Sequence, residues 1–145
     1  MTPPLVVERH IDAPPSEVYR YLTESERWAR WQGVDASIDA RPSGTFAMTM
    51  GNGMRARGQF VELVPDRRVV FTWGWIDHPG VPPGSTTVEI DLTPRGGGTL
   101  VVLTHRDLPE DEIQVHTIGW EHHVSRLATA SVGEDPGPDP GPGQV

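Results

Sequence analysis

The pattern of apolar and polar positions begins as a strand and then changes to helical spacing. Residues 5–11 (LVVERHI) alternate with a period of two, which predicts a strand. Pro14 and Pro15 end it, and residues 16–22 then carry apolar side chains at helical spacing, with proline near the helix start. Trp28 and Trp31 are spaced to share one face of a second short helix. We therefore expect the first strand to be followed by two short helices and not by a hairpin.

From Gly33 to Arg106 the pattern is almost entirely that of strands joined by turns. We expect strands at 34–38, 46–50, 54–64, 69–75, 86–94 and 99–105. Short connections between successive strands imply an antiparallel meander. The facing of strand 54–64 stays open, because two alternating sets compete for its inner face. These sets are Gln59, Val61 and Leu63 against Gly58, Phe60 and Glu62, and a β-bulge would invert the facing beyond it.

A helical period begins after Pro109. Side chains then recur at steps of three and four, namely Ile113, His116, Trp120, Val124 and Leu127. Three acids, residues 110–112, precede them in the first turn, where carboxylates are favourable. The pattern predicts an amphipathic helix from Glu110 to about Ser131, which at about 1.5 Å per residue is roughly 30 Å long. Such a helix is long enough to lie along the whole sheet and cover its inner face.

The last residues of the chain carry no apolar periodicity. Residues 133–145 (GEDPGPDPGPGQV) are rich in Pro, Gly and Asp, a composition typical of disorder. We therefore expect one domain over residues 1–132, followed by a disordered tail over residues 133–145. The length of 145 residues fits a single domain with a real core.

The composition argues against several classes of function. The net charge of −8 argues against nucleic acid or an anionic membrane as partner, because either demands a basic face. Cysteine is absent, which excludes disulfides, thiolate catalysis and Cys-ligated zinc. We find neither a membrane-spanning apolar run nor a signal peptide and expect a cytoplasmic protein. All 12 basic residues are Arg, which we interpret as GC-rich coding in a bacterium and not as function.

The order of the elements and a set of short motifs resemble a known superfamily. The motifs are Asp12-Ala13-Pro14, Trp28-x-x-Trp31, Arg41-Pro42-Ser43-Gly44, Gly58, Val69-x-Phe71-x-Trp73, residues 99–105 (TLVVLTH) and Gly119-Trp120. Over about residues 4–130 they resemble the START-like helix-grip (SRPBCC) superfamily, in particular the group related to the heat-shock-protein 90 ATPase activator homologues. Ser43 departs from the usual Gly-Gly turn. The resemblance implies an α+β helix-grip fold, a curved antiparallel sheet of about seven strands wrapped on a long C-terminal helix.

The inward faces of the expected strands and of the long helix converge on one volume. Large apolar side chains line ligand pockets well, and members of the superfamily include ligand carriers. We therefore expect a small apolar molecule to bind in a cavity between sheet and helix. Its expected contacts are Phe46, Met48, Phe71, Trp73, Trp75, Val101, Leu103 and Trp120. The alternative, that these side chains simply fill the core, is the more frequent role of such stripes and stays open.

Three polar residues are further candidates for binding the ligand. Arg9 and His105 lie on inward faces of the first and last strands, which are neighbours in the helix-grip order. We expect them close together at one end of the cavity, holding an acidic or carbonyl group; His116 is the third candidate. Each has a purely structural alternative in a hydrogen bond or ion pair. His116 and His123 are about 10 Å apart along the helix, too far to share one metal ion, so we expect no metal and no cofactor.

Hypotheses from different classes remain for the function. We expect binding of a small lipophilic or aromatic molecule without catalysis. The first alternative is a cyclase- or dehydratase-type enzyme for a polyketide-like substrate, with His105 or His116 as general base; an open cleft with two or more converging ionisable groups would favour it. The second is a co-chaperone-like interaction module, which in the family also depends on a separate N-terminal domain. A homodimer is left open.

Overall fold

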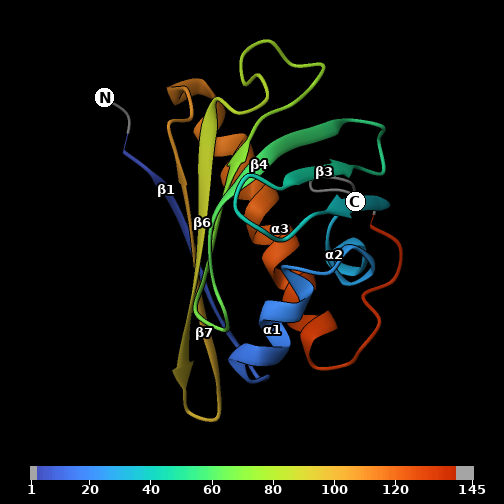
Figure 1. Ribbon diagram of the computed structural model, residues 1–145, viewed down its shortest axis with the longest axis vertical. Coiled ribbons are helices and arrows are strands. Elements are labelled where there is room, and N and C mark those ends of the chain that lie inside the picture. The colour runs from blue at the N-terminus through green and yellow to red at the C-terminus, as the bar shows by residue number, and fades with distance from the viewer. Residues whose placement is uncertain (1–2, 140–145) are drawn as a thin grey trace.

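A curved sheet that grips a long helix dominates the structure, a computed structural model that describes residues 3–139 (Figure 1). Its elements follow in the order β1 (Leu5–Ile11), α1 (Pro15–Tyr21), α2 (Ser25–Trp31), β2 (Asp35–Ile38), β3 (Thr45–Thr49), β4 (Arg55–Val64), β5 (Arg68–Trp73), β6 (Thr86–Arg95), β7 (Gly98–Arg106), a 3-10 turn (Glu110–Glu112) and α3 (Ile113–Ser131). The predicted α+β helix-grip fold is confirmed, including the two short helices after the first strand.

The strands of the described residues form one seven-stranded sheet in the order β1-β7-β6-β5-β4-β3-β2. Every neighbouring pair is antiparallel, and the first strand pairs with the last. The register shifts between Phe60 and Glu62 of β4. Before this irregularity Gly58 and Phe60 face the core, which settles the facing that the sequence left open. Beyond it the facing is inverted, since Leu63 is half-buried between exposed Glu62 and Val64, as an extra residue in the strand requires.

Helix α3 lies in the concave side of the sheet, with α1 and α2 beside it (Figure 1). Trp120, Val124 and Leu127 are buried on its inner face, as the helical spacing predicts. Helix α2 is held by Trp31, whose indole N–H donates to the backbone oxygen of Tyr21 at 2.9 Å. None of the helices in the described part of the chain is both long and apolar enough to cross a membrane.

An aromatic cluster forms the centre of the core. The rings of Phe46 and Phe71 stack with centroids 4.5 Å apart, and Trp28 meets both edge-on at 5.0 and 5.6 Å. All three side chains are fully buried. Aromatic pairs at such distances add to the free energy gained from burial. The cluster therefore fixes β5 at Phe71, two residues before Trp73.

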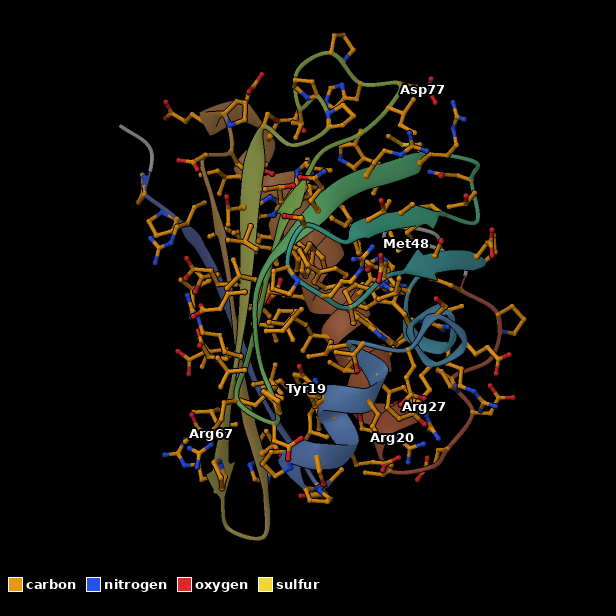
Figure 2. The ribbon with its side chains drawn as sticks, in the orientation of Figure 1. Tyr19, Arg20, Arg27, Met48, Arg67 and Asp77 are labelled. Atoms are coloured by element: carbon orange, nitrogen blue, oxygen red, sulfur yellow. The ribbon has the colours of Figure 1, made fainter. Side chains whose placement is uncertain are left out.

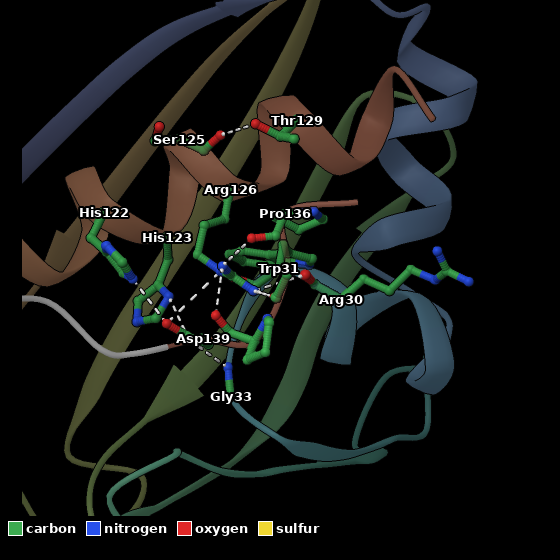
Figure 3. A network of polar contacts seen from close by, with 12 residues as sticks. Arg30, Trp31, Gly33, His122, His123, Ser125, Arg126, Thr129, Pro136 and Asp139 are labelled. Atoms are coloured by element: carbon green, nitrogen blue, oxygen red, sulfur yellow. Dashed lines mark hydrogen bonds and ion pairs between the residues drawn. The ribbon is translucent and has the colours of Figure 1, made fainter. Parts of the chain in front are cut away.

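The chain that follows α3 turns back onto the domain, where Arg126 of α3 binds it (Figure 3). The Arg126 guanidinium donates to the backbone oxygens of Pro136 and Gly137 at 3.1 and 2.8 Å. It also donates to the backbone oxygens of Arg30 and Trp31 at 3.2 and 3.1 Å. One nearly buried side chain therefore ties the C-terminal segment to the end of α2.

Asp139 attaches the same segment at a second point. Its carboxylate accepts the backbone N–H of Gly33 at 3.0 Å and is almost completely buried. Residues 136–139, which fall within the expected disordered tail, thus make long-range contacts with α3 and with the end of α2 in the described structure. The expectation for residues 140–145 lies outside the described residues.

Candidate functional site

A pocket of about 540 Å³ opens between the sheet and α3. It is bounded by the end of β5 and the loop after it, by the turn between β3 and β4, and by the first half of α3. Its volume falls in the range of about 300–1,000 Å³ that small-molecule sites occupy. The described lining combines tryptophan and methionine side chains with histidines and carboxylates. The pocket therefore offers both apolar surface and ionisable groups.

Three tryptophans form the apolar walls. Trp73 lies against Trp75 nearly at right angles, with centroids 5.1 Å apart, and against Trp120 of α3 at the same distance. Trp75 stands beyond the end of β5 after Gly74, where the backbone of Pro82 leaves no room for a side chain. The close approach of the two backbones at Gly74 thus positions Trp75 over the pocket. Walls set at steep angles suit a flat, aromatic guest.

His116 lies deeper in the pocket and is held at both ring nitrogens. The indole N–H of Trp75 donates to His116 Nε2 at 3.1 Å, and His116 Nδ1 donates to the backbone oxygen of Glu112 at 2.9 Å. Burial lowers the pKa of His116 below its usual value. The imidazole is therefore neutral near pH 7, with its donor and acceptor atoms already engaged.

Carboxylates and a further histidine form the rim. Glu112 accepts from His78 Nε2 at 2.9 Å and lies 3.5 Å from His116 Nδ1. Asp77 projects at the end of the molecule where the loop after β5 meets the β3–β4 hairpin, and it pairs there with Arg55 at 3.3 Å (Figure 2). No arginine is among the described lining residues. The rim is thus suited to hydrogen-bond donors, and an anionic group would meet repulsion there.

His105 is fully buried beneath the pocket and makes two side-chain hydrogen bonds. Its Nδ1 accepts the indole N–H of Trp120 at 2.9 Å, and its Nε2 lies 2.8 Å from the hydroxyl of Thr86. Thr86 in turn donates to the backbone oxygen of Trp73 at 2.7 Å. Burial, with a smaller contribution from the neighbouring His116, lowers the pKa of His105 to about 3. His105 therefore positions two of the tryptophan walls and has no free nitrogen for a ligand within the described structure.

The structure divides the residues that the sequence singled out into two groups. Four of them line the pocket, namely Trp73, Trp75, His116 and Trp120. Six others are buried in the core and outside the described lining, namely Phe46, Met48, Phe71, Val101, Leu103 and His105. The predicted apolar residues thus have two roles. Those at one end line the pocket, and the others fill the core.

Arg9 is the exception among the predicted site residues. It pairs with Val101 in the sheet, whereas His105 pairs with Leu5, four residues away along β1. Arg9 is exposed, although Val7 before it is buried. The expected joint anchor of Arg9 and His105 for an acidic group is therefore not formed. Because β1 is an edge strand, its inward-facing positions near the rim of the sheet can still reach water.

Several pocket residues were not among the expected ligand contacts. Met50 and Met54 flank the β3–β4 turn and so face the pocket together, and Glu112 lies four residues before His116 on the same helical face. The helical spacing of Glu112 and His116 is a signal that sequence reasoning could have used. Asp139, by contrast, carries no local signal, because it reaches the pocket from a segment that composition marks as disordered.

Known proteins with related sequences or structures share this architecture. The human protein "Activator of 90 kDa heat shock protein ATPase homolog 1" is 27% identical over 109 residues, which are 75% of this chain and 31% of the human protein. This chain thus spans about a third of that relative's length. The solved structure of an AHSA1-like protein from Rhizobium etli is 42% identical, with a TM-score of 0.73, and covers 100% of this chain and 92% of its own.

A third likeness shows the fold alone. DynU16, a protein of the dynemicin biosynthetic locus, is 24% identical, with a TM-score of 0.80 over 94% of this chain and 49% of its own. The family comparison reaches further, since residues 12–131 match the family described as "Activator of Hsp90 ATPase homolog 1-like protein". That range runs from the end of β1 to the end of α3 and includes nearly all the pocket walls. The chain therefore belongs to the Activator of Hsp90 ATPase homolog 1-like family.

Proposed function

We propose that this protein binds a small, uncharged aromatic molecule in the pocket between β5 and α3. The observation that carries the proposal is the group of Trp73, Trp75 and Trp120 around a space of about 540 Å³. Indole rings at steep mutual angles contact a flat ligand on more than one side. Side chains that only filled the core would leave no such volume, since interiors pack to nearly crystalline density.

The polar groups of the pocket favour an uncharged ligand over an acid. Asp77 and Glu112 line the rim, and the only arginine expected near the ligand, Arg9, lies outside the described lining. The indole N–H of Trp73 is buried and has no hydrogen-bond partner among residues 3–139. Buried donors are normally satisfied, but this one is closed off from the pocket as well as from solvent, so the case for an uncharged ligand rests on the rim carboxylates.

A fluorescent probe tests the proposal directly. N-phenyl-1-naphthylamine is uncharged and aromatic, and its emission rises in apolar surroundings. We expect saturable binding to the wild-type protein, with affinity lowered roughly three- to tenfold by Trp75→Leu. Trp75→Phe is the matched variant, because it also removes the N–H bonded to His116 but keeps an aromatic face, and it should retain most of the affinity.

The control for this experiment is Ile118→Ala, which changes an exposed apolar residue of α3 outside the pocket lining. It should leave binding unchanged. No saturable binding to the wild-type protein, or equal affinities for Trp75→Leu and Trp75→Phe, would contradict the proposal. Thermal melts of each variant separate a loss of binding from a loss of folding.

One observation favours acid–base catalysis as a second candidate function. Glu112 lies between His78 and His116, at 2.9 and 3.5 Å, and it connects the rim of the pocket to the deeper imidazole. Such a cluster is able to transfer a proton to or from a bound carbonyl compound, as a cyclase or dehydratase requires. Turnover of an aromatic polyketide-like substrate that disappears in Glu112→Gln, with probe binding retained, would support this function.

A further inference from the structure

Three groups with metal-binding atoms meet where the C-terminal segment crosses α3 (Figure 3). They are His122, His123 and Asp139, and their ligand atoms all lie within 4.8 Å of one another. His122 Nε2 is 2.9 Å from Asp139 Oδ1, and His123 Nδ1 is 3.4 Å from Asp139 Oδ2. The two imidazoles are consecutive in the helix, yet their ring centroids are only 4.8 Å apart.

These separations suit a divalent metal ion. Bonds from zinc to nitrogen or oxygen are about 2.0–2.2 Å long, which places tetrahedral ligands about 3.3 Å apart. The separations of Asp139 from the two histidines, 2.9 and 3.4 Å, lie on either side of that value. The separation between the two histidine nitrogens is within 4.8 Å, so a small rotation of the rings would complete the site. Two imidazoles with one carboxylate form a ligand set that zinc and cobalt accept. Three protein ligands would leave one coordination position open.

His123 gives an independent indication of a bound group. Its side chain is 3% exposed, yet neither ring nitrogen makes a well-aligned hydrogen bond within the described part of the chain, although Nδ1 lies 3.4 Å from Asp139 Oδ2 and the ring also interacts with the backbone of Trp31. Buried polar atoms without partners are rare and call for an explanation, such as an ion.

A nearby positive charge opposes a cation at this point. Arg126 Nε lies 3.8 Å from Asp139 Oδ1. Its guanidinium is turned toward backbone oxygens, including those of Trp31 and Gly137 at 3.1 and 2.8 Å, and these carbonyl dipoles offset part of its field. We therefore expect weaker binding than at a structural zinc site without such a neighbour.

We propose that His122 Nε2, His123 Nδ1 and the Asp139 carboxylate bind one divalent ion of the zinc type. His123 and Asp139 are also among the residues that line the pocket, so the site adjoins it. Binding requires His122 to carry its proton on Nδ1, because Nε2 must present a lone pair to the metal. The ion would join the C-terminal segment to α3, and the site does not depend on whether the pocket takes an aromatic ligand.

Cobalt(II) is the probe for the test, with protein purified without a polyhistidine tag. We expect one equivalent of Co²⁺ to give visible d–d absorption bands, and Zn²⁺ to displace it and raise the melting temperature of the protein. His122→Gln changes a partly exposed side chain, and Asp139→Asn keeps an oxygen for the N–H of Gly33. Each should weaken Co²⁺ binding about tenfold or more.

Two control variants test whether the binding is specific to this place. His10→Gln removes an exposed histidine that pairs with Asp12 at 3.2 Å, and His78→Gln removes the histidine bonded to Glu112 at the pocket rim. Both should bind Co²⁺ like the wild-type protein. The proposal is overturned if an excess of Co²⁺ gives no bands, or if the bands persist in His122→Gln and Asp139→Asn at unchanged affinity.

Discussion

Ser43 occupies a backbone conformation that side chains with a Cβ avoid. Its φ is 67°, in the turn between β2 and β3, where its N–H donates to the backbone oxygen of Phe60 at 2.8 Å. The left-handed region costs a non-glycine residue about 1–2 kcal/mol. Glycine avoids that cost, but it loses more conformational entropy on folding, which cancels part of the gain. We predict that Ser43→Gly raises the free energy of unfolding by roughly 0.5–1 kcal/mol in urea titrations. Ser37→Gly, in regular strand β2, should lower it; a decrease in both variants would refute the argument.

Single residues were predictable wherever alternation alone decided their facing. Trp73 and Trp75 share a face in the sequence and both line the pocket, as expected of a period of two. Arg9 follows the same alternation and is nevertheless exposed, because pattern does not reveal that an edge position remains open to water. Asp139 could not be predicted at all, since its partners His122 and Gly33 are distant in sequence. Local periodicity carries no information about such contacts.

The C-terminal segment behaves as a structural element without being a helix or strand. Arg126 donates to Pro136 and Gly137, and Asp139 accepts from Gly33. Removing residues 133–145 would leave a nearly buried guanidinium with fewer partners, and an unsatisfied buried group costs about 1–3 kcal/mol. We predict a loss of that order on truncation after residue 132, measured by chemical denaturation. A chain that ends at residue 139 keeps every described contact and serves as control; equal stability of the two would show that the segment contributes nothing.

The regular elements were predictable because each carries its own period. The six strands between residues 34 and 106 and the helix over 110–131 differ from the observed bounds mainly at their ends. The segment after α3 has no period, and its composition indicates disorder. Arg126 nevertheless holds this segment in place, because its planar guanidinium has five donors and can bind several backbone oxygens of a segment that is neither helix nor strand. Such binding depends on tertiary placement, which composition does not contain.

At the scale of the whole molecule, fold and ligand were predictable to different degrees. The order of elements and motifs leads to the helix-grip fold, because few topologies accommodate one strand, two helices, six strands and a long helix. The pocket occupies only one end of the sheet–helix space, and the rest is packed by Phe46, Phe71 and their neighbours. The boundary between the pocket and the packed core depends on small differences in side-chain volume. The sequence therefore predicted the space between sheet and helix, but not which part of it is filled and which part is open.

Stability should depend on pH through the buried histidines. Burial lowers the pKa of His105 from 6.5 to about 3 and that of His123 to about 4, and it also lowers the pKa of His116. Between about pH 6.5 and pH 4 the unfolded chain therefore binds protons that the folded chain does not. The free energy of unfolding falls as the pH falls through this window, by up to about 1.4 kcal/mol per pH unit for each histidine. Above the unfolded pKa these groups contribute no slope.

The variant His105→Gln isolates one part of this pH effect. Glutamine can still accept from Trp120 and donate to Thr86 but does not titrate, so the variant should lose less stability than the wild-type protein on acidification. The measurement is the free energy of unfolding from urea titrations at several pH values between about 7.5 and 4. The difference between the two proteins cancels the carboxylates that they share. Parallel curves would mean that His105 is protonated equally in the folded and unfolded states, and its proposed role as a neutral support for the tryptophan walls would then be wrong.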